Sequence, residues 1–172
     1  MTFTSPVRRE DPPDIAPERE ALAAYLDFHR ATVLMKLEGL DDEQLRRPMV
    51  PSGVCLLGLV KHLAQVEHSW FSRVIARSGE PFLYSTREDP DADFRIEAGE
   101  TTESVVASYL SACERSQEIY AATESLDELR RHHRLPIDLD VRSIMIHMIE
   151  ETARHNGHAD IIRELIDGAT GV

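Results

Sequence analysis

The segment HMIEETARHNGHAD, residues 147–160, decides how this chain can fold. At 100° per residue a helix places His147, Glu151 and His155 on one strip, with His158 on the same face. The same side of the helix carries core-type residues: Ile144, Met148, Thr152, Ala159, Ile162 and Leu165. Burying a carboxylate and imidazoles is costly unless they are paired or bind a metal. The segment therefore predicts an interior metal site or, alternatively, a buried Glu–His network compensated by Arg154 or Arg163.

Four long helical patterns are expected, and this segment lies in the last of them. In each, apolar residues recur at three- and four-residue spacing. The expected helices cover residues 17–39, 54–77, 102–123 and 140–167, and a capping-box sequence at 41–44 opens a short extra turn. Residues 1–16, rich in proline and charge, are expected to form an N-terminal arm, and residues 17–172 a single domain. The fold class is all-α, most simply a four-helix bundle.

The connection between the second and third helices, residues 78–101, is unusually long. Helices of this size span roughly 30 Å, so a long connection can cross back and start a parallel helix. A decorated loop on a plain up-and-down bundle fits the same length equally well. No segment alternates clearly with period two, although residues 81–86 could form a short extended piece.

Charge and composition exclude several classes of protein. The formal net charge is −12, which argues against a nucleic-acid binder and against an anionic membrane as partner. The chain has neither an apolar run of roughly 18 residues nor a secretory signal, so a cytoplasmic location is expected. Cys55 and Cys113 form no CxxC pair and are interpreted as small buried hydrophobes.

A third metal ligand should come from another helix, and His62 is the best candidate. It lies in LLGLVKHLAQVEHSWF, residues 56–71, one turn from Leu59 and Val66, and Gly58 leaves space beside it. His68 has more polar neighbours on the same helix. The remaining histidines are interpreted as structural or solvated: His29 as a core histidine bonded to a backbone group, and His132 and His133 as parts of a charged connection.

Two blocks of the sequence resemble the DinB-like superfamily. They are LLGLVKHLAQVEHSWFSRVIA (56–76) and HMIEETARHNGHADIIRELIDGATG (147–171), and the resemblance extends over the chain from about residue 17. It is closest to the branch found in mycothiol-producing bacteria. It implies a four-helix bundle with a long crossover, in which the second and third helices run parallel (up-down-down-up). Homodimers are common in that superfamily.

The resemblance also implies a metal site. Family members take one histidine from the second helix and an i, i+4 pair from the fourth, which correspond to His62, Glu151 and His155. Many members carry histidine in place of Glu151, whereas mycothiol-dependent isomerases carry glutamate there. His158 takes a position that is not a ligand in the family, where it could line the pocket or shuttle a proton. His147 is expected to lie behind the metal ligands and support them, and Trp70 is expected to form part of the pocket wall.

Two imidazoles and one carboxylate are typical of catalytic zinc with an open position, with nickel, iron or manganese as alternatives. The resemblance implies that a small-molecule thiol such as mycothiol occupies that position and attacks an electrophilic small molecule. The first hypothesis is thus a metal-dependent thiol S-transferase or thiol-dependent isomerase. A metal-dependent hydrolase is the second, since the same site could activate water. A non-catalytic metal-binding stress-response module is the third.

Overall fold

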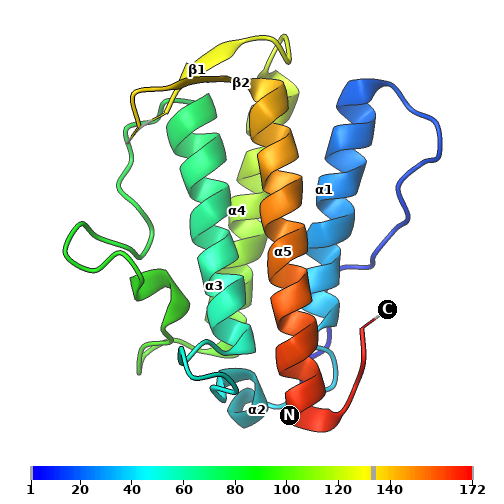
Figure 1. Cartoon of the computed structure of the whole chain (residues 1–172), viewed down its shortest axis with the longest axis vertical. Helices are drawn as coiled ribbons and strands as arrows, with labels where there is room; N and C mark the ends of the chain where they lie inside the picture. Colours follow the sequence, from blue (N-terminus) through cyan, green and yellow to red (C-terminus); the bar gives the residue numbers. More distant parts are fainter. Residues whose placement is uncertain (1, 133–134, 172) are drawn as a thin grey trace.

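Four long helices lie side by side in the computed structural model, which describes residues 2–132 and 135–171 (Figure 1). They are α1 (Glu18–Met35), α3 (Leu56–Glu67) continued by η1 (His68–Ile75), α4 (Thr102–Ala122) and α5 (Val141–Asp167). The shorter elements are α2 (Asp42–Arg46), η2 (Ala92–Phe94), β1 (Leu129–Arg131) and β2 (Asp138–Asp140). The described part of the chain is thus mostly helical, as the apolar spacing predicts.

The helix ends follow local sequence signals. Asp41 accepts a hydrogen bond from the Gln44 amide and forms a complete capping box before α2. Asp140 accepts one from the Ser143 amide, at 2.7 Å, before α5. Gly168, with φ of 79°, ends α5 in the left-handed conformation that glycine adopts without strain. These caps confirm the predicted extra turn and both predicted ends of the last helix.

α3 and α4 begin at the same end of the molecule. The hydroxyl of Thr102, at the start of α4, donates at 2.6 Å to Asp42 of α2, the short helix that precedes α3. At the other end, Arg130, which follows α4, donates to the carbonyl of Ile75 at 2.9 Å. Figure 1 shows these two helices running in one direction and α1 and α5 running in the other. The segment between η1 and α4 therefore returns along the bundle, and it brings η2 against α3.

The core consists of two clusters of buried apolar side chains. One joins all four long helices around Leu34, Leu57, Val60, Val106 and Ile162. The other lies toward η1 and the start of α5, around Leu26, Phe71, Ile144, Met145 and Met148. Since both clusters consist of apolar residues, the fold is expected to hold without help from the polar residues of α5.

Three features differ from the sequence predictions. The second helix is not α-helical to its end, because His68–Ile75 adopts the wider π-helical turn, with the Ala76 amide bonded to the Phe71 carbonyl at 2.8 Å. An antiparallel hairpin pairs Leu129 with Asp140, and strands of three residues are too short to show an alternating pattern. Residues 81–86 form no strand, and Leu165, predicted on the buried side, is 52% exposed.

The first residues of the chain are attached to the bundle. The Phe3 amide donates to the carbonyl of Leu40 at 2.8 Å, and the Gly39 amide donates to the carbonyl of Phe3 at 2.9 Å. Residues 2–16 contain no helix. Of the helices in residues 2–132 and 135–171, none combines the length and the apolar character needed to cross a bilayer.

Candidate metal centre

Glu151 and His155 occupy successive turns of α5 and point into the same space. His155 Nε2 lies 3.2 Å from Glu151 Oε1. This closeness follows from helix geometry, because side chains four residues apart lie one above the other. His155 is 8% exposed, and Glu151 is half-buried.

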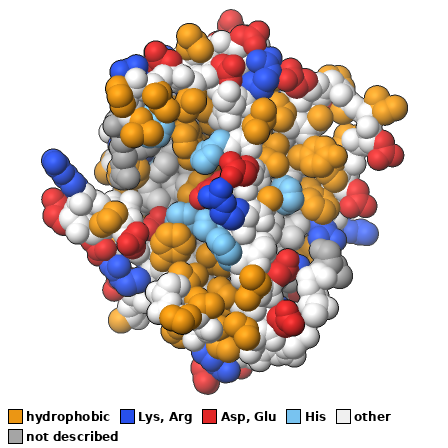
Figure 2. Space-filling view, in the orientation of Figure 1, with side chains coloured by type: hydrophobic (Ala, Val, Ile, Leu, Met, Phe, Trp, Pro, Cys, Tyr) orange, Lys and Arg blue, Asp and Glu red, His pale blue; other side chains and the backbone are white. Residues whose placement is uncertain are grey.

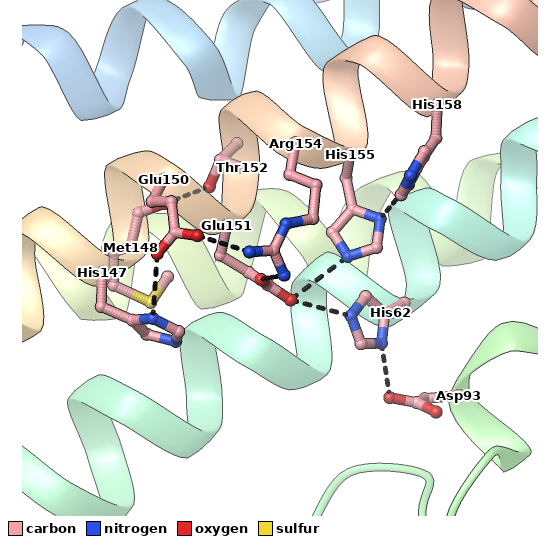
Figure 3. Close-up of polar contacts among 10 residues, drawn as sticks. All are labelled: His62, Asp93, His147, Met148, Glu150, Glu151, Thr152, Arg154, His155 and His158. Carbon is pink, nitrogen blue, oxygen red and sulfur yellow. Dashed lines mark hydrogen bonds and ion pairs between the residues drawn. The ribbon is translucent and has the colours of Figure 1, made fainter.

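His62 reaches the same space from α3. Its Nε2 lies 3.6 Å from Glu151 Oε1, and its ring centroid lies 4.7 Å from that of His155 (Figure 3). One ligand atom from each of His62, Glu151 and His155 lies within 4.8 Å of the other two. The structure therefore brings together the three residues that the sequence singled out as a ligand set.

The donor set fits a divalent cation on two grounds. Two imidazole nitrogens and one carboxylate oxygen are the ligands that zinc and related metals take in proteins, and three such ligands leave a position open. His62 Nε2 is also buried and makes no hydrogen bond with any described residue. A buried polar atom without a partner is costly unless a bound group satisfies it.

The charges at this site are strongly coupled. Burial lowers the pKa of His62, but the hydrogen bond to Asp93 and the nearby carboxylate of Glu151 outweigh it and leave the pKa above its usual value. The hydrogen bond from His155 and the nearby imidazole of His62 hold the pKa of Glu151 far below its usual range. Without a cation, the site therefore favours an ionised carboxylate beside a protonated imidazole.

Asp93 is a site residue that the sequence analysis missed. It belongs to η2, in the long connection, and its Oδ2 lies 2.9 Å from His62 Nδ1. Its neighbour Phe94 stacks on the His62 ring with centroids 4.0 Å apart. Asp93 is only 5% exposed. An acidic residue in an irregular, charged connection carries no periodic signal, so only the folded arrangement identifies it.

A close contact between η2 and α3 holds Asp93 in place. Gly58, one turn before His62, faces the backbone of Phe94. A Cβ atom added at Gly58 would fall inside van der Waals contact of the Phe94 carbonyl oxygen. Glycine at this position therefore lets the crossover approach closely enough for Asp93 to reach His62. The space inferred beside His62 from the sequence is filled by this segment.

The other predicted site residues lie around the ligand set without joining it. His158 is exposed, and its Nδ1 lies 3.3 Å from Nδ1 of His155. His147 does not contact the three ligands; its ring lies 4.6 Å from that of Trp70. Arg154, one of the two arginines considered as charge compensation, lies 3.4 Å from Glu151 Oε2. Arg163 instead donates to the carbonyls at the end of α1.

The remaining histidines divide between core and surface. The carbonyl of His29 accepts a hydrogen bond from the Asn156 side chain at 3.0 Å, and burial lowers the pKa of the His29 ring. The buried Asn156 thereby ties α5 to α1. His132 is half-buried, with its ring 5.2 Å from that of Trp70, so its side chain is only partly solvated. His133 lies outside the described residues.

Two cavities flank the ligand set. One, of about 380 Å³, includes His155 and His158 in its wall, and the other, of about 300 Å³, includes His62, Asp93 and Trp70. Figure 2 shows histidine side chains gathered at the centre of this face around charged groups, with hydrophobic side chains below them. The site is thus accessible to small molecules from the side where α3 and α5 meet.

Comparison with known proteins identifies a family for this chain. No curated protein matches the chain. The sequence model of the mycothiol-S-transferase family matches residues 21–168, which include all four long helices apart from the first three residues of α1, and every residue of the candidate centre. This chain belongs to the mycothiol-S-transferase family.

Proposed function

We propose that the protein is a metal-dependent thiol S-transferase that joins a small-molecule thiol, such as mycothiol, to an electrophilic small molecule. The observation that carries the proposal is the convergence of His62, Glu151 and His155 between two cavities. Membership of the mycothiol-S-transferase family supports the choice of thiol and reaction. Both cysteines are buried, and burial raises the pKa of each thiol, which agrees with a thiol supplied by a cofactor.

The proposed ligands are His62 and His155 through Nε2 and Glu151 through Oε1. Zinc is the first choice, with nickel, iron or manganese as alternatives. A divalent cation here would lower the pKa of a bound thiol and make the thiolate its resting form near neutral pH. The reaction then forms a carbon–sulfur bond, while the leaving group departs with its bonding electrons and the thiol proton passes to a base.

The surrounding residues orient the ligands and handle the proton. Asp93 accepts a hydrogen bond from His62 Nδ1 and so presents Nε2 to the cation. Nδ1 of His155 faces His158, which can accept its proton and hold the ring in the same way. Since His158 is exposed, we assign it the further role of passing the thiol proton to solvent. Trp70 forms a wall of the cavity beside His62, and His147 supports that wall.

The remaining assignments complete the proposal. The arrangement of α1, α3, α4 and α5 is interpreted as the up-down-down-up bundle of DinB-like proteins, with residues 1–16 as an arm and 17–172 as one domain. We propose a cytoplasmic protein that acts on small molecules and forms a homodimer. Neither nucleic acid nor a membrane is an expected partner.

The test is a rate measurement on untagged, metal-loaded protein with and without mycothiol. The expected result is an electrophile-consuming rate that rises with mycothiol and disappears when a chelator removes the metal. Circular dichroism should show the same helical content before and after chelation. A metal-dependent rate that ignores mycothiol would instead indicate the hydrolase. Metal binding without thiol affinity, measured by calorimetry, would indicate the non-catalytic module.

A further inference from the structure

The two cavities beside the metal centre differ sharply in chemistry. The cavity beside His155 is walled mainly by Val50, Val54, Leu59, Phe94, Ile161 and Ile162. Apart from the two histidines, Ser52 is its one polar lining residue among the residues that the structure describes. No lysine, arginine, aspartate or glutamate of the described chain contributes to its wall. A charged ligand group placed there would lose its hydration and find no counter-ion.

The cavity beside His62 is polar. Its lining includes Gln65, Ser69, Ser85, Asp91 and Asp93, together with the rings of Trp70 and His132. Hydroxyl and amide groups beside an aromatic face can bind a polar molecule that carries many hydroxyls. The cavity beside His62 therefore suits a polar reactant, and the cavity beside His155 suits an apolar one.

Phe94 lines both cavities, and each cavity has one histidine of the ligand set in its wall. Its ring is stacked on His62, which opens to the polar side, whereas His155 opens to the apolar side. Two molecules could thus approach one open coordination position from different directions. At about 380 Å³ the apolar cavity lies toward the small end of the roughly 300–1,000 Å³ typical of ligand pockets.

We propose that the apolar cavity beside His155 binds the electrophile through an uncharged alkyl or aryl group, and that the thiol enters from the polar cavity beside His62. The inference rests on the proposed function for the roles of the two molecules. It names the substrate class: small, uncharged, apolar electrophiles. Electrophiles whose cavity-bound group is charged are disfavoured, because no lysine, arginine, aspartate or glutamate of the described residues lines this cavity.

The first experiment measures binding of unreactive probes to the metal-loaded full chain. Uncharged n-alkyl alcohols from propanol to hexanol are titrated, and the methyl signals of ¹³C-labelled isoleucines are followed by NMR. Burial of one methylene is worth about fourfold in affinity, so binding should tighten by about that factor per carbon until the cavity is full. Hexyltrimethylammonium, a charged probe that cannot ligate the metal, should bind at least about tenfold more weakly than hexanol, because it must bury a charge.

A pair of isoleucines on α5 provides the matched variants. Ile161 lines the cavity and is 57% exposed, whereas Ile146 is 53% exposed and does not line it. Ile161→Asp should weaken hexanol binding more than about fivefold, since it places a charge in the apolar wall. Ile146→Asp should change it less than twofold. Because both side chains are exposed, both variants should fold.

The single tryptophan separates the two cavities. Trp70 lines the polar cavity and not the apolar one, so mycothiol should change its fluorescence and hexanol should not. Affinity that does not depend on chain length, equal binding of hexyltrimethylammonium and hexanol, or equal effects of the two isoleucine variants would overturn the inference. Since none of these measurements needs turnover, they can fail while thiol-dependent activity remains, and succeed while it is absent.

Discussion

The two halves of the ligand set are held in different ways. Glu151 and His155 belong to one helix and meet because they are one turn apart. His62 comes from another helix, and its ring is fixed by Asp93 and Phe94 from the irregular crossover. The first half is thus a local property of α5, whereas the second depends on the long connection packing against α3. A defect in that connection should damage the metal site without changing any ligand.

Loss of the cross-helix ligand should have the largest effect. His62→Ala leaves two ligands on one helix. Loss of a residue that only hydrogen-bonds to a ligand lowers metal affinity by up to roughly 100-fold, so loss of the ligand itself should lower it further. Elemental analysis of untagged protein after dialysis measures the retained metal. His68→Ala is the matched control, because His68 follows in the same helical segment and bonds to the Pro81 carbonyl instead. Full metal occupancy in His62→Ala would disprove the cross-helix site.

Removal of the Asp93 carboxylate, the hydrogen-bond partner of His62, should have the next largest effect. Asp93→Asn keeps the shape but replaces the anion that orients His62, so metal affinity should fall about 10- to 100-fold. Competition with a coloured chelator measures it. Asp91→Asn is the control, since Asp91 lines the same cavity and is exposed, and the structure shows no hydrogen bond or ion pair between it and His62. Equal affinities for the two variants would mean that Asp93 does not position His62.

Protons should compete with the metal through His62. Its pKa is raised above 6.5, so competition should begin at a pH above 6.5, and affinity should fall by up to about tenfold per pH unit below the raised pKa. In the metal-free protein, the contribution of His62 to stability changes with pH in the opposite direction. Contacts that favour the imidazolium stabilise the fold fully below about pH 6.5 and are lost as pH rises through the raised pKa.

Chelator competition between pH 5.5 and 8 measures how metal affinity depends on pH, and thermal unfolding of the metal-free protein over the same range measures how stability does. The metal-free stability difference between the unmodified chain and His62→Gln should shrink as the pH rises through this range. Metal affinity that does not change with pH would show that His62 is not a ligand.

Substitution of two glycines, one on each ligand-bearing helix, should have the smallest effects. Gly58→Ala would push Phe94 and Asp93 away from α3, with an expected loss of about 1–3 kcal/mol of stability and a smaller fall in metal affinity than in Asp93→Asn. Gly157, within α5, has open space around it, and Gly157→Ala should stabilise the fold by up to about 1 kcal/mol without affecting metal. Chemical denaturation and chelator competition measure both. Unchanged stability and metal affinity in Gly58→Ala would contradict the proposed role of the contact between the crossover and α3.

The candidate site shows where sequence reasoning succeeds. Glu151 and His155 stand out because helical periodicity puts polar groups into an apolar stripe, and His62 stands out because it borders another such stripe. His158 and His147 share the face of α5 but do not join the ligand set: His158 contacts only His155 among the three ligands, and the His147 ring packs against Trp70. Asp93 and the polar cavity escaped notice because irregular segments carry no periodic pattern.

The amino-acid sequence by itself determined the long helices, their caps and the polar strip of α5, because these depend on spacing along one chain segment. Only the tertiary structure decided which carboxylate orients His62, how the crossover meets Gly58, and that an apolar cavity adjoins His155 while a polar one adjoins His62. Those features depend on contacts between residues about thirty or more positions apart, and no local pattern encodes such distances.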